Sequence, residues 1–231
     1  MAASILEARD IGMVFGSGDS VQHALRGVCL SVSAGEVLML RGPSGSGKTT
    51  LLSIMGGILS PTQGELYIDG HPMTGLSPRE RSRLRLRYFG FIFQEYNLFT
   101  TLSCVQNVQV ALDLRGVPRE QARKLAADTL REVGLGAKLH ESPARLSGGQ
   151  KQRLAVARAL AGDPLVLLAD EPTAALDSVN GLMIMALLRD LAHARGRAVI
   201  VVTHDDRITP YADRVVHIED GRISPVGEVT A

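Results

Sequence analysis

The residues best suited to chemistry form a glycine-rich run that ends in a lysine and a threonine. The run is Gly42-Pro43-Ser44-Gly45-Ser46-Gly47-Lys48-Thr49, which fits the pattern G-x-x-x-x-G-K-[ST]. Its glycines let successive backbone N–H groups point inward at phosphate oxygens, and a following helix start adds a partial positive charge. Lys48 would bring a full charge to the β- and γ-phosphates, and the Thr49 hydroxyl could hold Mg²⁺. A plain glycine-rich turn is the alternative. The apolar strand before the run and the helical start from Thr50 onward favour phosphate binding.

Two carboxylates follow a second apolar stretch. Asp170 and Glu171 come directly after residues 165–169, which lack any polar side chain, as is typical of a strand buried in a parallel sheet. Ligands of open α/β sheets bind at the carboxyl ends of the strands. We therefore expect Asp170 to reach Mg²⁺, directly or through water, and Glu171 to polarise an attacking water as general base. A solvated loop start is the alternative, and the phosphate loop upstream favours the catalytic interpretation.

A third run, Leu146-Ser147-Gly148-Gly149-Gln150, opens a predicted helix that extends to Ala161. It offers a serine hydroxyl, unhindered glycine amides and the positive end of a helix dipole, and so predicts a second anion site. One ATP molecule has a single γ-phosphate. We therefore expect two chains to meet head to tail, each run covering the nucleotide held by the other chain's phosphate loop. A capped helix with a glycine hinge is the alternative.

Taken in chain order, the runs 42–49, 146–150 and 170–171 resemble the phosphate loop, the signature motif and the acidic pair of ATP-binding-cassette ATPases. The resemblance covers Ile5 to Ile223. It implies roles for four further residues: Phe15 stacks on adenine, Gln94 contacts Mg²⁺ or water and faces the membrane partner, Asp177 crosses the dimer interface, and His204 contacts the γ-phosphate. Taken singly, Phe15 could be a core residue, Gln94 a polar residue at a helix entry and His204 a surface turn residue.

The resemblance implies a P-loop NTPase of the α/β class. We expect a RecA-like core with an N-terminal antiparallel β-subdomain at residues 1–93 and 163–231, and an inserted helical subdomain at 94–162, within one ATPase domain of residues 1–231. The resemblance also implies ATP and Mg²⁺ as cofactors and a second copy of the chain as partner. Lys48, Glu171 and His204 are the expected catalytic residues. Thr49, Gln94 and Asp170 are the residues expected near the metal.

Several stretches are most similar to the exporters of macrolides, released lipoproteins and heterocyst glycolipids. Many macrolide and lipoprotein proteins have Thr-Gly-Asn-Leu-Asp where this chain has Thr173-Ala174-Ala175-Leu176-Asp177, so the glycolipid branch is the more similar one. In this group the ATPase pairs with a four-helix permease, often with a periplasmic adaptor, and such systems can transmit force instead of moving cargo through the membrane. The resemblance thus implies a cytoplasmic protein, peripheral on the inner face of the cell membrane.

The elements that position these residues can be predicted from hydrophobic periodicity. Alternation over 28–33 and at Leu66 and Ile68 predicts strands with one wet face, and Asp69-Gly70 predicts a turn. Helical spacing appears over 121–133, where Pro118 suits the first turn, and over 149–161 and 182–194. Residues 198–203 predict a second buried strand, and Asp220-Gly221 a hairpin. A buried sheet interrupted by a helical insert accounts for this order.

Composition narrows the choice of partner and compartment. The formal net charge is +1, which gives no drive toward nucleic acid. The longest apolar runs are strand-sized, and the N-terminus lacks the layout of a secretory signal, so we expect a cytosolic chain that reaches a membrane through a partner. The two cysteines suit neither a disulfide framework nor a zinc site. Five alternating arginines, from Arg79 to Arg87, predict a solvated helix face, with anionic lipid as the alternative ligand.

Two other functions are alternatives to transport. Cassette ATPases of chromosome maintenance separate their halves with long coiled coils, and translation-factor types carry two cassettes per chain; neither feature occurs in this sequence. A regulatory nucleotide-binding module without turnover is the second alternative. Glu171 and His204 argue against it because both serve hydrolysis and not binding alone.

Overall fold

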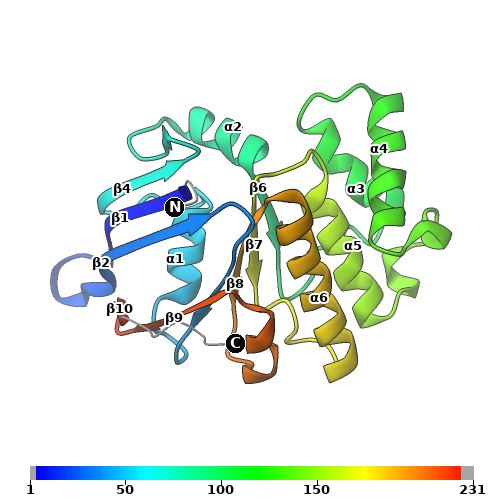
Figure 1. Cartoon of the computed structure of the whole chain (residues 1–231). Helices are drawn as coiled ribbons and strands as arrows, with labels where there is room; N and C mark the ends of the chain where they lie inside the picture. Colours follow the sequence, from blue (N-terminus) through cyan, green and yellow to red (C-terminus); the bar gives the residue numbers. More distant parts are fainter. Residues whose placement is uncertain (1–3, 225–231) are drawn as a thin grey trace.

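The computed structural model describes residues 4–224, and a six-stranded sheet runs through it (Figure 1). Residues 1–3 and 225–231 lie outside the described residues. The predicted ATPase domain of residues 1–231 includes both segments, and the N-terminus that lacks the layout of a secretory signal includes the first. The strand order is β10-β9-β3-β8-β7-β6, and every neighbouring pair is parallel except β9 with β10. The strands are β3 (Val37–Arg41), β6 (Phe89–Ile92), β7 (Val166–Asp170), β8 (Ala198–Val202), β9 (Arg214–Glu219) and β10 (Arg222–Ser224).

A second, antiparallel sheet comes mainly from the N-terminal residues. Its order is β2-β1-β4-β5, with β1 at Ser4–Phe15, β2 at Gln22–Ser33, β4 at Gln63–Ile68 and β5 at His71–Pro72. Asp69 and Gly70 both have positive φ in the turn between β4 and β5, as the turn dipeptide predicts. The long pairing of β1 with β2 matters for function because it brings Phe15 directly opposite Gln22.

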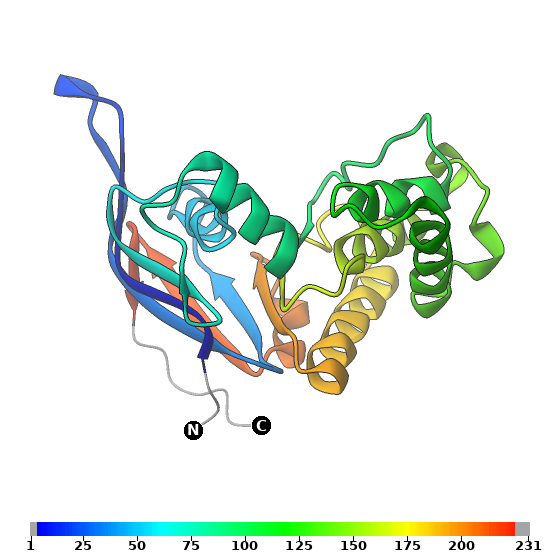
Figure 2. The ribbon, with the colours of Figure 1, turned by 90° about the horizontal axis from the view of Figure 1, so that it is seen from above.

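The helices fall into two groups. The core helices are α1 (Lys48–Met55), α2 (Pro78–Tyr88) and α6 (Ser178–Arg195), and the others are α3 (Cys104–Asp113), α4 (Arg119–Glu132) and α5 (Gly148–Leu160). Short 3₁₀ turns lie at Gly18–Ser20, Gly136–Lys138, Pro143–Arg145 and Asp206–Tyr211. Figure 2 shows α3, α4 and α5 as a lobe on the side away from the antiparallel sheet. These three helices lie within 94–162, but the exact division into subdomains remains a prediction.

Two cores explain why the central strands are apolar throughout. On β3, Leu38 and Leu40 belong to a core shared with α1 and the antiparallel sheet. Val37 and Met39 point the other way, into a core shared with α5 and α6. Successive side chains of a strand face opposite sides of a sheet, so a strand covered on both sides has no place for polar residues. The packing of both faces holds the carboxyl edge of the sheet in place.

The structure differs from the predicted elements in several places, and strand β1 and helix α3 were not predicted as separate elements. Helix α6 begins at Ser178 and not near 182, because Asp177 caps it by accepting a hydrogen bond from the Asn180 N–H (2.9 Å). Strand β6 escaped prediction because it has only four residues. Pro118 is the residue before α4 and not part of its first turn.

The arginine run is only partly a solvated face. A helix places residues four apart on one side, so Arg79, Arg83 and Arg87 share one exposed face. Arg81 and Arg85 lie on another side and contact the segment after α1. Arg85 donates to the Gly57 carbonyl (3.2 Å), and Arg81 donates to the Ser60 hydroxyl. None of the helices in residues 4–224 is both long enough and apolar enough to cross a bilayer.

Candidate nucleotide-binding site

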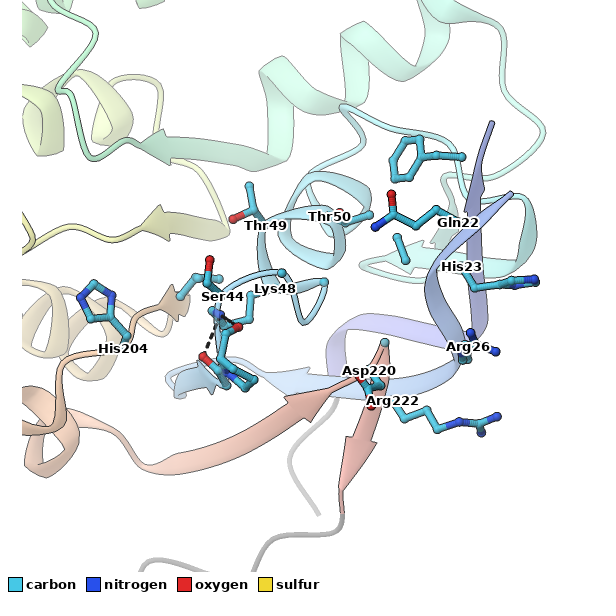
Figure 3. A pocket seen from close by; sticks show the side chains of 18 of the residues that line it. Gln22, His23, Arg26, Ser44, Lys48, Thr49, Thr50, His204, Asp220 and Arg222 are labelled. Atoms are coloured by element: carbon cyan, nitrogen blue, oxygen red, sulfur yellow. Dashed lines mark hydrogen bonds between the residues drawn. The ribbon is translucent and has the colours of Figure 1, made fainter. Parts of the chain in front are cut away.

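A cavity of about 1090 Å³ opens at the carboxyl edge of the six-stranded sheet (Figure 3). Its floor is the loop between β3 and α1. Residues that lie far apart in the sequence meet there because parallel strands end at the same edge. The predicted residues that line it are Phe15, Gly42, Pro43, Ser44, Gly45, Gly47, Lys48, Thr49, Thr50, Glu171 and His204.

The glycines at 42 and 47 allow the phosphate loop to pass close to neighbouring backbone. A Cβ on Gly42 would lie 2.0 Å from the carbonyl oxygen of Ile218, and the φ of Gly42 is 153°. At Gly47, a Cβ would lie 2.5 Å from the carbonyl oxygen of Ala24 at a φ of 101°. Any larger residue would push the loop off β2 and β9. The loop therefore depends on glycine at both positions.

Lys48 is a nearly buried cation that donates two short hydrogen bonds to backbone oxygens and a longer one to the Ser46 hydroxyl (3.5 Å). Its Nζ donates to the carbonyls of Gly42 (2.8 Å) and Pro43 (2.6 Å), and the residue is 9% exposed. Among residues 4–224, no carboxylate lies within ion-pair distance of this amine. A desolvated cation without a counter-ion attracts anions strongly. Ser46, which was predicted to bind nucleotide, is buried beneath the loop and does not line the cavity.

Thr49 and Asp170 bring two oxygen ligands together at the edge of the cavity. The Thr49 hydroxyl donates to Asp170 Oδ1 over 3.4 Å. A hydroxyl and a carboxylate are the ligands that Mg²⁺ prefers, so the pair fits this metal. Burial and the neighbouring Glu171 raise the pKa of Asp170 above its usual range, which Thr49 and Lys48 partly offset. The negative charge of Asp170 is thus compensated only in part by Lys48, which suits a carboxylate that binds a metal.

We expect Asp170→Asn to stabilise the metal-free chain at pH 7. Folding raises the pKa of Asp170, so the native state is favoured while the group is protonated and loses that advantage as pH rises through the raised pKa. The asparagine cannot ionise, so the variant does not lose this stability at pH 7. A gain of about 1 kcal/mol would raise Tm by about 2–4 °C in a chain of this length. Thermal unfolding with EDTA at pH 7 and pH 4 measures it. The gain should shrink at the lower pH, and a lower Tm for the variant at pH 7 would contradict the assignment.

Glu171 and His204 form an acid–imidazole pair in the cavity wall. His204 Nδ1 lies 2.7 Å from Glu171 Oε1, and the other carboxylate oxygen, Oε2, is buried and has no hydrogen-bond partner within residues 4–224. Glu171 has a φ of 48°, an uncommon angle for a side chain other than glycine, and its N–H donates to the Val202 carbonyl (2.9 Å). Strained backbone held by the sheet is frequent where a side chain must point into a functional site.

Phe15 stands at the end of β1 and is not a core residue. It is 40% exposed and lines the cavity together with Gln22, its direct cross-strand neighbour. Figure 3 shows Gln22 near Thr50, while Arg26 and Arg222 lie on the side of the cavity away from His204. Five further residues line the cavity that residue spacing did not predict: Gln22, His23, Arg26, Asp220 and Arg222. The alternation of β2 predicts a solvent-exposed face of the strand, but it cannot show which residues that face contacts.

Gln94 lines a neighbouring cavity of about 510 Å³ and not the cavity of the phosphate loop. Glu171 and His204 are common to both cavities, so their pair forms the partition. Arg207 also lines the second cavity; it forms a bidentate pair with Asp205 (2.8 Å for both bonds) and donates to the Ser178 hydroxyl. Gln94 is therefore close to the proposed base but does not line the cavity that Thr49 lines. Asp170 lines neither cavity and meets the phosphate site through its hydrogen bond with Thr49.

The signature run and Asp177 are not brought to the Lys48 cavity of the same chain. Ser147 caps α5, accepting from the Gln150 N–H (3.4 Å), while its own N–H donates to the Gln150 side chain (3.1 Å). Gly149 packs against α6, where a Cβ would lie 2.5 Å from Asn180 Oδ1. None of Ser147, Gly148, Gly149, Gln150 and Asp177 is among the described residues that line that cavity. If these residues contact nucleotide, the nucleotide belongs to another copy.

Comparison with known proteins shows the family of this chain. The family model described as "ABC transporter" matches residues 25–174. A macrolide export ATP-binding/permease protein MacB of Hyphomonas neptunium is 44% identical over 96% of this chain and 34% of that protein. An uncharacterised ABC transporter ATP-binding protein of Thermotoga maritima is 42% identical over 96% of this chain and 94% of that protein. A dimeric structure of the ATP-binding cassette MJ0796 in a post-hydrolysis state with ADP and Pi covers 98% of this chain and 99% of that chain, with TM-score 0.88 and 37% identity.

The fold and the site thus define an ATP-binding cassette with an α/β P-loop NTPase core. The chain belongs to the ABC transporter family, and the predicted family and fold class are confirmed. It spans about a third of the length of the MacB relative, which carries a permease in the same chain by its name. The roles of individual site residues stay predictions.

Proposed function

We propose that this chain is the ATP-hydrolysing subunit of a membrane transporter and that it works as an ATP-bridged homodimer. One observation carries the proposal: the cavity that the Glu171–His204 pair lines also holds a nearly buried lysine, which has no carboxylate within ion-pair distance in the described part of the chain. The lysine suits a polyphosphate, and the pair suits the activation of water. The cassette fold and the dimeric relative with ADP and Pi support the same activity. Release of phosphate by the purified chain, with ATP and Mg²⁺ against an EDTA control, tests it.

The chain's own residues account for each step of hydrolysis. The backbone amides of 42–49 and the Lys48 ammonium bind the phosphates, and Thr49 with Asp170 would hold Mg²⁺, which neutralises phosphate charge. Glu171 accepts the proton of the attacking water, and its hydrogen bond to His204 orients the carboxylate. Lys48 and the loop amides stabilise the charge that develops on the γ-phosphate oxygens. Gln94, at the far side of the Glu171–His204 pair, would contact water there.

A homodimer completes the site. The exposed Ser147 hydroxyl and the start of α5 form an anion-binding helix end that does not face the chain's own cavity. We infer that Ser147, Gly148, Gly149 and Gln150 reach the γ-phosphate bound by the partner, with Asp177 at the interface. Hydrolysis removes contacts that hold the closed pair together, so the dimer opens.

The expected stacking of Phe15 on the adenine of ATP can be tested by substitution. We expect Phe15→Ala to weaken ATP binding about tenfold, since stacking of a base on an aromatic ring contributes about 1–3 kcal/mol. Fluorescence titration with a labelled ATP analogue measures the change. Phe99→Ala is the matched control: Phe99 is similarly exposed, at 48% against 40%, but lies outside the cavity. Equal affinities for Phe15→Ala and the parent chain would remove Phe15 from the site.

The proposal also includes a membrane partner and a location at the membrane. The MacB relative combines ATPase and permease, which supports a permease partner for this chain, and the branch resemblance adds a periplasmic adaptor. The chain would then lie on the cytoplasmic face of the membrane, held there by the permease. Affinity purification from solubilised membranes tests this, with the permease expected to co-purify. Recovery of the tagged chain from the membrane-free fraction alone, with no membrane protein attached, would argue against it.

A further inference from the structure

The loop that follows β6 has an unfavourable backbone. Tyr96 and Asn97 have φ angles of 61° and 49°, in the left-handed region that bulky side chains avoid. Its local hydrogen bonds run from the Tyr96 N–H to the Phe93 carbonyl (3.1 Å) and from the Asn97 N–H to the Glu95 carbonyl (2.6 Å). Such a conformation persists only where surrounding structure holds it. Gln94 lies inside this loop, so whatever holds the loop also places Gln94.

Arg158, near the end of α5, binds the loop from one side. Its Nη2 donates to the Tyr96 carbonyl (2.8 Å), and its Nη1 donates to the Asn97 carbonyl. Among residues 4–224, no carboxylate lies within ion-pair distance of this guanidinium, and burial lowers the pKa of Arg158. Its two donors therefore serve two successive backbone oxygens, both in left-handed residues. A planar fork suits such a pair, whereas a lysine ammonium presents a single point charge.

Tyr96 reaches the other end of α5. A Cβ on Gly148 would lie 3.3 Å from the Tyr96 hydroxyl oxygen, so the hydroxyl packs against the first residue of the helix. Gly148 belongs to the run 147–150 that we place on the partner's nucleotide. Helix α5 is thus joined to the Gln94 loop twice, through Arg158 near its end and through Gly148 at its start.

We infer that Arg158 and Tyr96 are positioning residues that lock the Gln94 loop to α5, so that the loop and the 147–150 run move as one unit. The inference rests on the proposed homodimer. Gln94 lies beside Glu171 and His204. Because Arg158 and Tyr96 join the loop to α5, a shift of the loop would also move the start of α5, which we place on the partner's nucleotide. Neither positioning residue lines the Lys48 cavity, so the chain's own nucleotide contacts do not depend on them.

The test separates dimer closure from nucleotide binding. All variants carry Glu171→Gln, which is expected to slow turnover strongly, and are studied with ATP and Mg²⁺. Sedimentation analysis gives the dimer dissociation constant, and titration with a fluorescent ATP analogue at low protein concentration gives the affinity of the single chain. We expect Arg158→Lys to raise the dimer dissociation constant about tenfold, as loss of one charged hydrogen bond would. The affinity of the single chain should not change.

Arg115→Lys is the matched control. Arg115 also has a pKa lowered by burial, and its Nε donates to a backbone carbonyl, that of Leu86 (2.5 Å), in α2 and not in the Gln94 loop. Loss of that bond should lower Tm as much as Arg158→Lys does, yet leave the dimer dissociation constant unchanged. Tyr96→Ala is a second variant that acts from the other end of α5. It should weaken the dimer in the same direction as Arg158→Lys.

Each outcome is decisive. Weaker dimers for Arg158→Lys and Tyr96→Ala, with Arg115→Lys like the parent, support the lock. Dimers as tight as the parent's for both test variants overturn it while the proposed function stands. Equal weakening by Arg115→Lys shows a general loss of stability and overturns it too. A Glu171→Gln parent that stays monomeric with ATP overturns the proposed homodimer and the inference together.

Discussion

Glu171→Gln is expected to bind ATP as well as the parent chain while hydrolysing it about 10³-fold more slowly, within the range of about 10²–10⁴ that general-base catalysis contributes. The amide keeps the size of the side chain and can still hydrogen-bond His204, so the cavity is unchanged in shape. It cannot accept a proton from water at neutral pH. With binding intact and turnover blocked, the closed dimer should accumulate.

Phosphate release measures the turnover of this variant, and size exclusion with light scattering measures the dimer. Glu120→Gln is the matched control, since Glu120 is an exposed carboxylate on α4, away from both cavities. It should hydrolyse ATP like the parent. Normal turnover in Glu171→Gln would mean that another group removes the proton, and His204 would then be the first candidate because it shares the same wall.

Lys48→Ala should weaken ATP binding about 100-fold, which corresponds to about 3 kcal/mol. The loss is expected because hydrogen bonds to charged groups contribute about 1.5–3 kcal/mol each. In the structure the ammonium already lies among loop carbonyls with little exposure to water, so its charge is weakly screened toward a phosphate. Equilibrium titration with ATP and Mg²⁺ gives the affinity.

A control variant and a stability measurement accompany this experiment. Lys124→Ala removes the same charge from the exposed face of α4 and should leave affinity unchanged. Thermal unfolding of both variants shows whether loss of the two carbonyl contacts destabilises the loop. If Lys48→Ala is well folded and binds ATP like the parent, the lysine has no part in phosphate recognition and the proposed site must be reconsidered.

The chemistry of the site could be predicted because it is encoded in short segments. The run 42–49 and the pair Asp170-Glu171 each follow an apolar strand, and parallel strands place their carboxyl ends on one edge. The same rule brings His204, which follows β8, beside Glu171. Local spacing and strand polarity predict that the run 42–49 and the pair Asp170-Glu171 meet, whatever the length of chain between them. The part played by His204 was implied only by the family resemblance.

Contacts between elements without a short-range signature could be known only from the tertiary structure. Gln94 lies in a cavity beside the phosphate site, in a loop that turns through two left-handed residues, and periodicity carries no trace of that turn. Gln22 meets Phe15 because of the register of β1 with β2, which includes several bulges. Arg158 looks in the sequence like any polar residue of an amphipathic helix, yet it binds a loop about sixty residues away. The local sequence motifs determine which chemical groups this chain has and at which strand ends they lie. Packing decides which partners they meet, because the distance between elements depends on the whole core and not on neighbouring residues.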